Sequence, residues 1–247
     1  MSSGGRLRGA LCLPLIYAWG LCATAVIALW ALLCRRQFQR RGHKVIRWWG
    51  RVPLALLGIR LDVSGREHLA TAGPKIVAFN HLSTLDLFTV SSLVPRHPLV
   101  LYKKELARIP GLGWALMATR MIPVARGDRE RAVASILDAG RRIRDEGAAV
   151  LIAPEGTRSP DGRLGPFKMG LFHLAAATSI PVVPVIYHGT AKLLPMGSWC
   201  ARPGSIRVEV LAPIDTTDWK EDTVRTHASM LESVFSERLA APESVAG

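Results

Sequence analysis

A histidine and an aspartate separated by four residues are the strongest candidates for chemistry in this chain. His81 follows an apolar run, Ile76 to Phe79, that is typical of a buried strand, and Asp86 stands where an apolar helical pattern begins. Side chains five positions apart do not share one face of a regular helix. We therefore expect His81 in a turn after a strand and Asp86 at the start of the next helix. There the carboxylate can orient the imidazole and stabilise the imidazolium, so the pair has the composition of a general base.

A second polar stretch, Pro154 to Ser159, follows another apolar run, Ala149 to Ala153. Sites on α/β sheets form at the carboxyl ends of strands, on loops of this kind. Arg158 offers a planar fork of donors that suits a phosphate, and Gly156 lets the backbone approach a ligand closely. A solvated surface turn explains the same residues, so this stretch alone does not decide between the two interpretations.

The 247-residue chain is apolar and basic, with a mean hydropathy of +0.21 and a formal net charge of +13. Residues 1–61 hold ten Lys/Arg and no Asp or Glu, whereas residues 62–247 hold 22 against 19. Basic charge beside an apolar segment favours an anionic membrane surface as a partner. The folded part shows no basic face, so we expect no nucleic-acid partner. The four cysteines show no disulfide framework or metal-ligand spacing, which predicts a reducing compartment and no metal site.

No charged residue occurs from Gly9 to Cys34, a stretch longer than the ~20 residues that cross a bilayer. We expect residues 1–42 to form an N-terminal membrane segment with a basic flank. Its apolar part either crosses the membrane or, if Pro14 and Gly20 break it, forms a helical hairpin that dips into one leaflet. More Lys and Arg follow this part than precede it, which places the body of the protein in the cytoplasm.

The segment from His43 to Ile59 mixes Trp, Arg and Lys with aliphatic residues. We favour an interfacial amphipathic helix, kinked or broken at Pro53, over an ordinary helix that covers a sheet. We expect residues 43–240 to form one catalytic domain and residues 241–247 a frayed tail.

Beyond residue 60, short apolar runs alternate with helical patterns, which predicts an α/β fold. We expect a single, mostly mixed or parallel sheet of about seven strands flanked by helices. The expected strands are Leu61–Val63, Lys75–Phe79, Leu99–Tyr102, Arg120–Val124, Ala149–Ala153, Val182–Ile186 and Ile206–Leu211. A helix is expected from Asp128 to Glu146, and another from about Asp218 to Ala240 with Glu221 completing a capping box.

These blocks together resemble the glycerolipid (lysophospholipid) acyltransferase family, and within it the bacterial 1-acylglycerol-3-phosphate acyltransferases. Asn80-His81 with Asp86, followed by Pro154 to Ser159, looks like two motifs of that family in their usual order. Four further segments resemble it between and beyond them, so that about residues 45–215 are covered: Lys103–Pro110, Ile122–Arg126, Phe167–Gly170 and Ile180–Val185. Pro123, Ala125 and Ala153 depart from the family's pattern, and they leave the identity of the acyl acceptor open.

The resemblance implies transfer of a fatty acyl group from acyl-CoA or acyl-carrier protein to the sn-2 hydroxyl of 1-acylglycerol 3-phosphate (lysophosphatidate). No cofactor and no covalent intermediate are needed, because the acceptor hydroxyl attacks the thioester directly. His81 would take the hydroxyl proton, and Asp86 would orient and charge-stabilise His81. The implied location is the cytoplasmic side of a bacterial inner membrane.

The remaining implied residues serve substrate binding. Arg158, with Arg126 and Lys103, would hold the acceptor phosphate, and Glu155 would bond the glycerol or brace Arg158. The loop is completed by Gly156 and Thr157, with Lys168 as a neighbour of the phosphate.

Other interpretations remain open at this point. Arg126 also suits a salt bridge at a strand end, Lys103 a solvated helix start, and Lys168 loop packing. The acceptor also fits a lyso-ornithine lipid or another lysophospholipid. A thioester hydrolase, or a lipid-binding protein without turnover, is the alternative of a different class.

Overall fold

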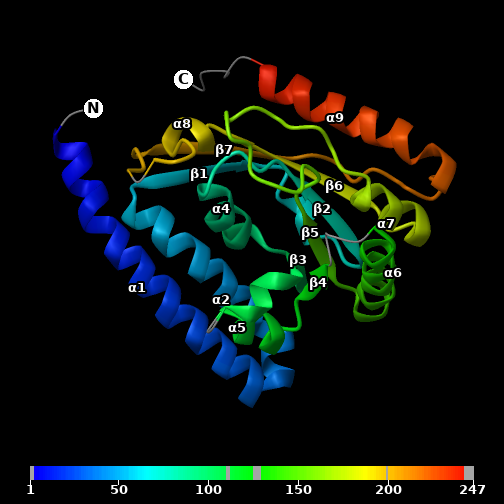
Figure 1. Cartoon of the computed structure of the whole chain (residues 1–247), viewed down its shortest axis with the longest axis horizontal. Helices are drawn as coiled ribbons and strands as arrows, with labels where there is room; N and C mark the ends of the chain where they lie inside the picture. Colours follow the sequence, from blue (N-terminus) through cyan, green and yellow to red (C-terminus); the bar gives the residue numbers. More distant parts are fainter. Residues whose placement is uncertain (1–2, 110–111, 125–128, 199, 242–247) are drawn as a thin grey trace.

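A seven-stranded mixed sheet forms the centre of the structure, and helices cover both of its faces (Figure 1). The computed structural model describes residues 3–109, 112–124, 129–198 and 200–241. The strands are β1 (Ile59–Ser64), β2 (Lys75–Phe79), β3 (Pro98–Lys103), β4 (Ile122–Val124), β5 (Ala149–Ile152), β6 (Val182–His188) and β7 (Gly204–Val210). The helices are α1 (Ser3–Leu33), α2 (Arg35–Leu56), α3 (Glu67–Ala70), α4 (Leu85–Leu93), α5 (Leu112–Ala118), α6 (Arg129–Glu146), α7 (Gly170–Thr178), α8 (Thr190–Leu193) and α9 (Val224–Ala240), with 3₁₀ turns at Lys104–Arg108 and Glu221–Thr223.

The strand order brings the two polar motifs to one edge of the sheet. The order is β1-β7-β6-β2-β5-β3-β4, and the five strands from β6 to β4 are mutually parallel. β7 is antiparallel to β6 and parallel to β1, which makes the sheet mixed. Because β2 and β5 are parallel neighbours, their carboxyl ends lie side by side. His81 follows one of these ends, and the loop from residue 153 to residue 169 follows the other.

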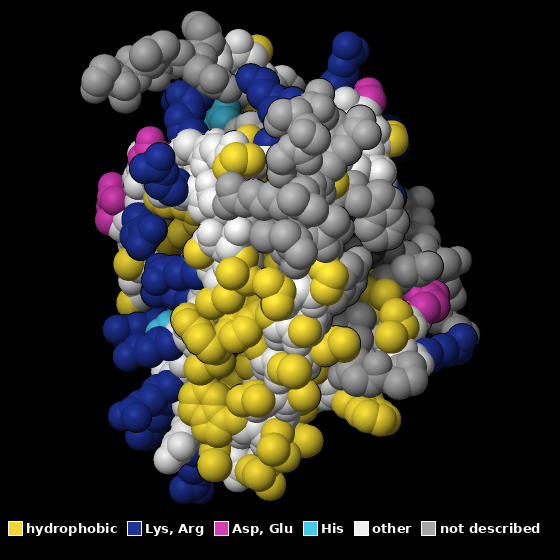
Figure 2. Space-filling view, turned by 90° about the vertical axis from the view of Figure 1, so that its left-hand side faces the viewer, with side chains coloured by type: hydrophobic (Ala, Val, Ile, Leu, Met, Phe, Trp, Pro, Cys, Tyr) yellow, Lys and Arg dark blue, Asp and Glu magenta, His cyan; other side chains and the backbone are white. Residues whose placement is uncertain are grey.

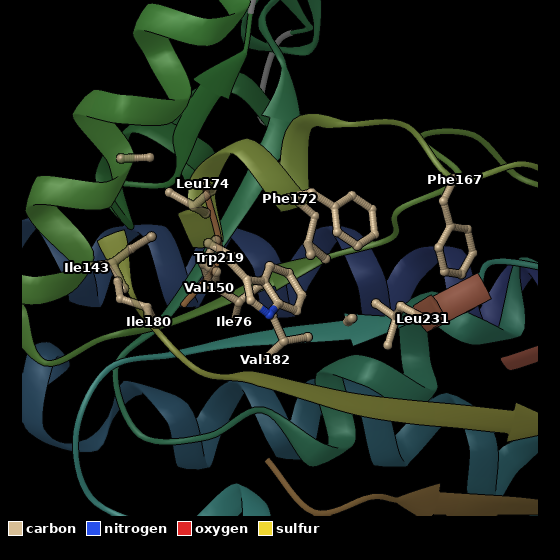
Figure 3. Close-up of a cluster of buried hydrophobic side chains, with 14 of the residues drawn as sticks. Ile76, Ile143, Val150, Phe167, Phe172, Leu174, Ile180, Val182, Trp219 and Leu231 are labelled. Atoms are coloured by element: carbon tan, nitrogen blue, oxygen red, sulfur yellow. The ribbon is translucent and has the colours of Figure 1, made fainter. Parts of the chain in front are cut away.

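Alternate residues of the central strands enter two separate cores, as the period of a strand requires. Ile76 and Val150 pack with side chains of α6, α7 and α9 in the core drawn in Figure 3. Val77 and Leu151 pack on the opposite face with side chains of α2 and α4. Each of these four side chains is at most 4% exposed, and burial of such a side chain stabilises a fold by about 1.5–3 kcal/mol. The strands that carry the polar motifs are therefore rigidly held from both sides.

The two N-terminal helices form an antiparallel pair with its turn at Cys34 (Figure 1). The indole N–H of Trp19 donates to the carbonyl of Trp49 at 3.2 Å, and the rings of Trp19 and Trp48 lie 4.2 Å apart. On its other side α2 packs against α4, where Gly50 lies so close to the backbone of Phe88 that a Cβ would clash. The pair is thus attached to the same helix that carries Asp86.

The seven predicted strands are all present, with ends shifted by at most two residues, and the predicted fold class is confirmed. The predicted boundary between residues 42 and 43 lies inside α2, which begins at Arg35 and not at His43. Pro53 does not break α2, and α1 continues through Pro14 and Gly20, so neither forms the turn of a hairpin. Arg120 has a φ of 58° and lies before β4, not within it.

The start of the last helix was predicted wrongly. α9 begins at Val224, after the 3₁₀ turn, and the reciprocal capping bonds join Lys220 and Thr223 in place of Asp218 and Glu221. The hydroxyl of Thr223 accepts from the main-chain N–H of Lys220 and donates to the carbonyl of the same residue.

Candidate active site

The turn that carries His81 is fastened to the sheet by the residue before it. The side-chain amide of Asn80 donates to the carbonyl of Tyr187 at 2.9 Å, and its oxygen accepts the Tyr187 main-chain N–H at 2.8 Å. Asn80 is fully buried, and its amide extends the pairing of β2 with β6 by one step in place of the backbone. The chain can therefore leave the strand at His81 without leaving strand β6 unpaired.

His81 and Asp86 meet across this turn. Nδ1 of His81 lies 3.1 Å from Oδ2 of Asp86, with a quarter of the His81 side chain exposed and Asp86 fully buried. The same Oδ2 accepts the main-chain N–H groups of Leu82 at 2.6 Å and Ser83 at 2.7 Å. These donors, together with the N-terminal end of α4, stabilise the negative charge of Asp86. The carboxylate holds the proton on Nδ1 and leaves Nε2 of His81 as the acceptor nitrogen.

Glu155 approaches the same histidine from the loop after β5. Its two carboxylate oxygens lie 3.2 Å and 3.3 Å from the main-chain nitrogen of His81, which donates to them. Burial raises the pKa of Glu155 to about 7, and the charge of Asp86 acts in the same direction, while the hydrogen bond from His81 opposes both. The main-chain N–H of Ser159 donates to the His81 carbonyl at 3.0 Å. The loop thus holds both polar groups of the His81 backbone.

Two cations flank the loop beside this turn. Nη1 of Arg158 donates to Oγ1 of Thr84 at 2.6 Å, which places the exposed guanidinium next to the turn between His81 and Asp86. Gly156 has a φ of 71°, and a Cβ there would lie 2.9 Å from Cδ of Lys168. The Lys168 side chain therefore lies over the turn at Gly156, and its main-chain N–H bonds the carbonyl of Pro154 at 2.8 Å. An anion that contacts this loop would meet two positive charges.

Comparison with known proteins identifies the family to which this chain belongs. The family model described as "Acyltransferase" matches residues 60–188, from β1 to the end of β6. The chain belongs to the acyltransferase family.

Relatives in this family share both sequence and fold with the chain. It is 33% identical over 238 residues to a 1-acyl-sn-glycerol-3-phosphate acyltransferase of Limnanthes alba, covering 96% of this chain and 82% of that one. The protein of the same name from Haemophilus influenzae is 29% identical, over 79% of this chain and 80% of its own. The crystal structure of the 1-acyl-sn-glycerophosphate acyltransferase of Thermotoga maritima superposes with a TM-score of 0.78 at 24% identity, covering 96% and 98% of the two chains.

The structure gathers most residues predicted for the site of this acyltransferase. The turn after β2 and the loop after β5 bring together His81, Asp86, Glu155, Gly156, Thr157, Arg158 and Lys168. Glu155 bonds the main chain of His81, a contact that sequence reasoning did not anticipate for it. Lys103 ends β3, which is parallel to β5, so its backbone lies at the same edge; its side chain and the whole of Arg126 lie outside the described residues.

Three residues that position the site, Asn80, Thr84 and Ser159, were not assigned a role from the sequence. Asn80 was part of the recognised motif, and its place directly after an apolar run was the signal that it caps a strand. Thr84 and Ser159 carried no signal, because a hydroxyl in a polar loop is compatible with plain solvation. Within the described ranges, no group of three or more His, Cys, Asp or Glu side chains is placed to hold a metal ion.

Proposed function

We propose that this chain transfers a fatty acyl group from acyl-CoA or acyl-carrier protein to the sn-2 hydroxyl of 1-acylglycerol 3-phosphate, which produces phosphatidate. The observation that carries the proposal is the 3.1 Å bond between His81 and Asp86, built into a turn that the Arg158 loop also contacts. A general base and an anion-binding loop are the two parts that acylation of a phosphorylated alcohol requires. The names of the relatives agree with this substrate.

The proposed reaction begins at Nε2 of His81, which takes the proton from the acceptor hydroxyl while its oxygen attacks the thioester carbonyl. Asp86 stabilises the imidazolium that forms, since its charge is fixed by two main-chain donors. As the tetrahedral intermediate collapses, the new ester C–O bond remains and the C–S bond breaks. The thiolate takes the proton back from Nε2, so that His81 is neutral again. A base of this kind contributes about 10²–10⁴-fold to the rate.

The acceptor is held by its phosphate in this proposal. Arg158 can bind phosphate oxygens with two parallel donors, and the ammonium of Lys168, which lies close to Gly156, adds a second charge. Because Arg158 is bonded to Thr84, its position is tied to the turn that carries His81. Binding of the phosphate therefore also fixes the distance of the acceptor hydroxyl from the base, which is where positioning contributes to rate.

We further propose that the protein binds the surface of a membrane through its N-terminal helix pair. Figure 2 shows apolar side chains gathered on this face beside a column of Lys and Arg side chains. Pro14–Leu33 is long and apolar enough to cross a bilayer, and its exposed members include Leu21, Leu29, Leu32 and Leu33, each at least 57% exposed. α2 adds the basic residues Arg36, Arg40, Lys44 and Arg51, which suit anionic headgroups. This surface would keep the enzyme where lysophosphatidate resides.

The contacts of α1 favour a helix pair lying in one leaflet over a helix that crosses the membrane. α1 packs along α2 and also contacts α5, and the Trp19 bond to Trp49 fixes it to α2. A helix that crossed the bilayer alone would contact lipid on all sides, whereas α2 covers one side of α1 here (Figure 1). The chain turns at Cys34, and α2 leads back to the sheet. We also propose that the catalytic domain lies on the cytoplasmic side of a bacterial inner membrane.

The deciding experiment is an assay of the purified protein with labelled acyl-CoA and a panel of lysolipids, with and without acceptor. We expect acylation to be fastest with lysophosphatidate, and His81→Ala to lower kcat at least about 100-fold. His97→Asn is the matched control, because His97 is exposed, has a φ of 50° that asparagine tolerates, and lies directly before β3. If fatty acid is released as fast without an acceptor as with one, the protein is a thioester hydrolase. If no turnover occurs with any acceptor, it is a lipid-binding protein.

A further inference from the structure

A hollow of about 690 Å³ lies beyond the His81 turn, at the same edge of the sheet. Three segments enclose it: the loop at Gly162–Leu164, the end of β6 with α8, and the last turn of α9. Its volume lies within the range of 300–1,000 Å³ that is typical of sites for small molecules. The residues of the Arg158 loop that contact His81 or Thr84, namely Glu155, Arg158 and Ser159, do not line the hollow.

The hollow shares its walls with the site. Leu82, which lines it, directly follows His81 and donates its N–H to Asp86. Tyr187, which also lines it, is the residue whose backbone pairs with Asn80. A molecule bound there would contact the same turn that positions the base.

The hollow is electropositive. Arg163 and Lys192 line it and are exposed, and no Asp or Glu is among its described lining residues. The nearby carboxylate of Asp161 accepts from the Ser159 hydroxyl and from the main-chain N–H of Arg163, so it is directed into its own loop.

A second carboxylate near the hollow is outnumbered by cations. Glu209 lies 3.1 Å from His188, 3.3 Å from Arg207 and 3.5 Å from Arg238. His188 lines the hollow, and Arg207 lies 3.3 Å from its Nδ1. Two guanidinium groups against one carboxylate leave the surroundings of His188 positive, so the ligand that suits the hollow is an anion.

Part of the remaining lining is apolar. Leu82, Leu164, Leu239 and Ala191 contribute carbon surface between the charged side chains. A ligand that carries phosphates on an organic arm fits this combination better than an inorganic ion, because the arm can cover the apolar parts.

We propose that the hollow binds the phosphate-bearing end of the acyl donor, the phosphopantetheine handle of an acyl thioester. The inference rests on the proposed function, in which two molecules that both carry phosphate must meet at one histidine. Two phosphates repel each other at short range, so the acceptor phosphate at Arg158 and the donor phosphates need separate cationic sites. The pantetheine arm of such a donor spans the interval between its phosphates and its thioester. The donor site should therefore lie beside the His81 turn, as the hollow does, and not upon it.

The test is the double variant Arg163→Gln with Lys192→Gln, assayed with three donors carrying the same acyl chain. With acyl-CoA we expect the KM for the donor to rise about tenfold, with kcat and the KM for lysophosphatidate changed less than twofold. With acyl-pantetheine, which lacks phosphate, we expect no change. If the KM for acyl-4′-phosphopantetheine rises as much as the KM for acyl-CoA, the site binds the phosphate that CoA shares with carrier protein. If only the KM for acyl-CoA rises, the site binds the nucleotide part of CoA.

Arg225→Gln is the matched control, because Arg225 is an exposed cation at the opposite end of α9. A rise in the KM for lysophosphatidate in place of the donor would overturn the inference, as would an equal change with acyl-pantetheine. Binding of CoA to the wild-type protein and to the double variant, measured by calorimetry without acceptor, separates this inference from the proposed function. CoA binding that is lost only in the double variant supports the donor site even if lysophosphatidate is not the acceptor, and equal binding to both proteins refutes it.

Discussion

The buried carboxylate of Glu155 lies 3.2 Å from the main-chain nitrogen of His81, while Asp86 contacts the ring of the same residue. The two carboxylates therefore hold one histidine by its backbone and by its side chain. Their surroundings differ. Asp86 receives two short main-chain hydrogen bonds, whereas burial raises the pKa of Glu155 to about 7. Glu155 is therefore the carboxylate suited to exchange a proton near neutral pH.

This difference predicts a pH-dependent stability that disappears in Glu155→Gln. The pKa of Glu155 is raised from 4.5 to about 7, so the folded protein binds more protons than the unfolded chain between these values. The resulting stability is present below pH 4.5 and is lost as the pH rises through 7, by about 3 kcal/mol at most. We therefore expect the unfolding temperature in detergent to fall more steeply with rising pH for the wild-type protein than for Glu155→Gln. Parallel pH profiles for the two proteins would contradict it.

Asp86→Asn removes the charge of the side chain that contacts His81 and keeps its shape. The amide oxygen can still accept from Leu82 and Ser83, but the neutral side chain no longer stabilises the His81 imidazolium. We expect kcat to fall about 100-fold or more, with the KM for both substrates little changed. Single-turnover rates with acyl-CoA would measure this directly.

Asp86→Ala has a further consequence, because it removes the acceptor of both main-chain N–H groups. We expect it to lower the free energy of unfolding by about 2–4 kcal/mol more than Asp86→Asn does. The amide nitrogen of the Asn variant takes the place of Oδ1, which is buried with no hydrogen-bond partner among the described residues, so that variant is itself somewhat destabilised. Equal unfolding temperatures for the two variants would show that the turn does not depend on this carboxylate.

Sequence reasoning reached the fold and the chemistry because both depend on local patterns. Strands buried on both faces appear as uninterrupted apolar runs, such as Ile76 to Phe79 and Ala149 to Ala153. β1 and β7 instead alternate buried with more exposed residues, which is the period expected of a strand with one covered face. The spacing of His81 and Asp86 indicated a turn followed by a helix start, which is where the structure places them.

What sequence reasoning missed depends on contacts between distant segments. The bond of Glu155 to His81 joins residues 74 positions apart, and the bonds of Asn80 to Tyr187 span 107. No local pattern records such pairs. The turn of the N-terminal hairpin was missed for another reason: Pro14 and Gly20 weaken a helix locally, but packing of α1 on α2 keeps it continuous to Leu33.

Arg158→Ala is expected to act on one substrate only. Loss of the guanidinium should raise the KM for lysophosphatidate about 10- to 100-fold, since hydrogen bonds to charged groups contribute about 1.5–3 kcal/mol. The KM for acyl-CoA, and the rate with a monoacylglycerol that lacks phosphate, should change little. Arg225→Ala removes an exposed charge elsewhere and serves as the control. Equal weakening of both acceptors would mean that Arg158 supports the loop through Thr84 and does not bind phosphate.

The membrane surface on α1 predicts a loss of vesicle binding when charge is placed in it. Leu29 and Leu32 are 57% and 65% exposed and belong to α1. A charged side chain there must leave water to enter lipid, so we expect Leu29→Glu with Leu32→Glu to reduce co-sedimentation with anionic vesicles at least about tenfold. Met230→Glu on α9 adds the same kind of charge at an exposed apolar residue away from the helix pair, and should bind as the wild-type protein does. Activity towards a water-soluble short-chain lysophosphatidate should survive in the double variant, because the His81 turn is left intact. If activity towards this soluble acceptor falls in parallel with vesicle binding, the substitutions have disturbed the fold and not the membrane contact.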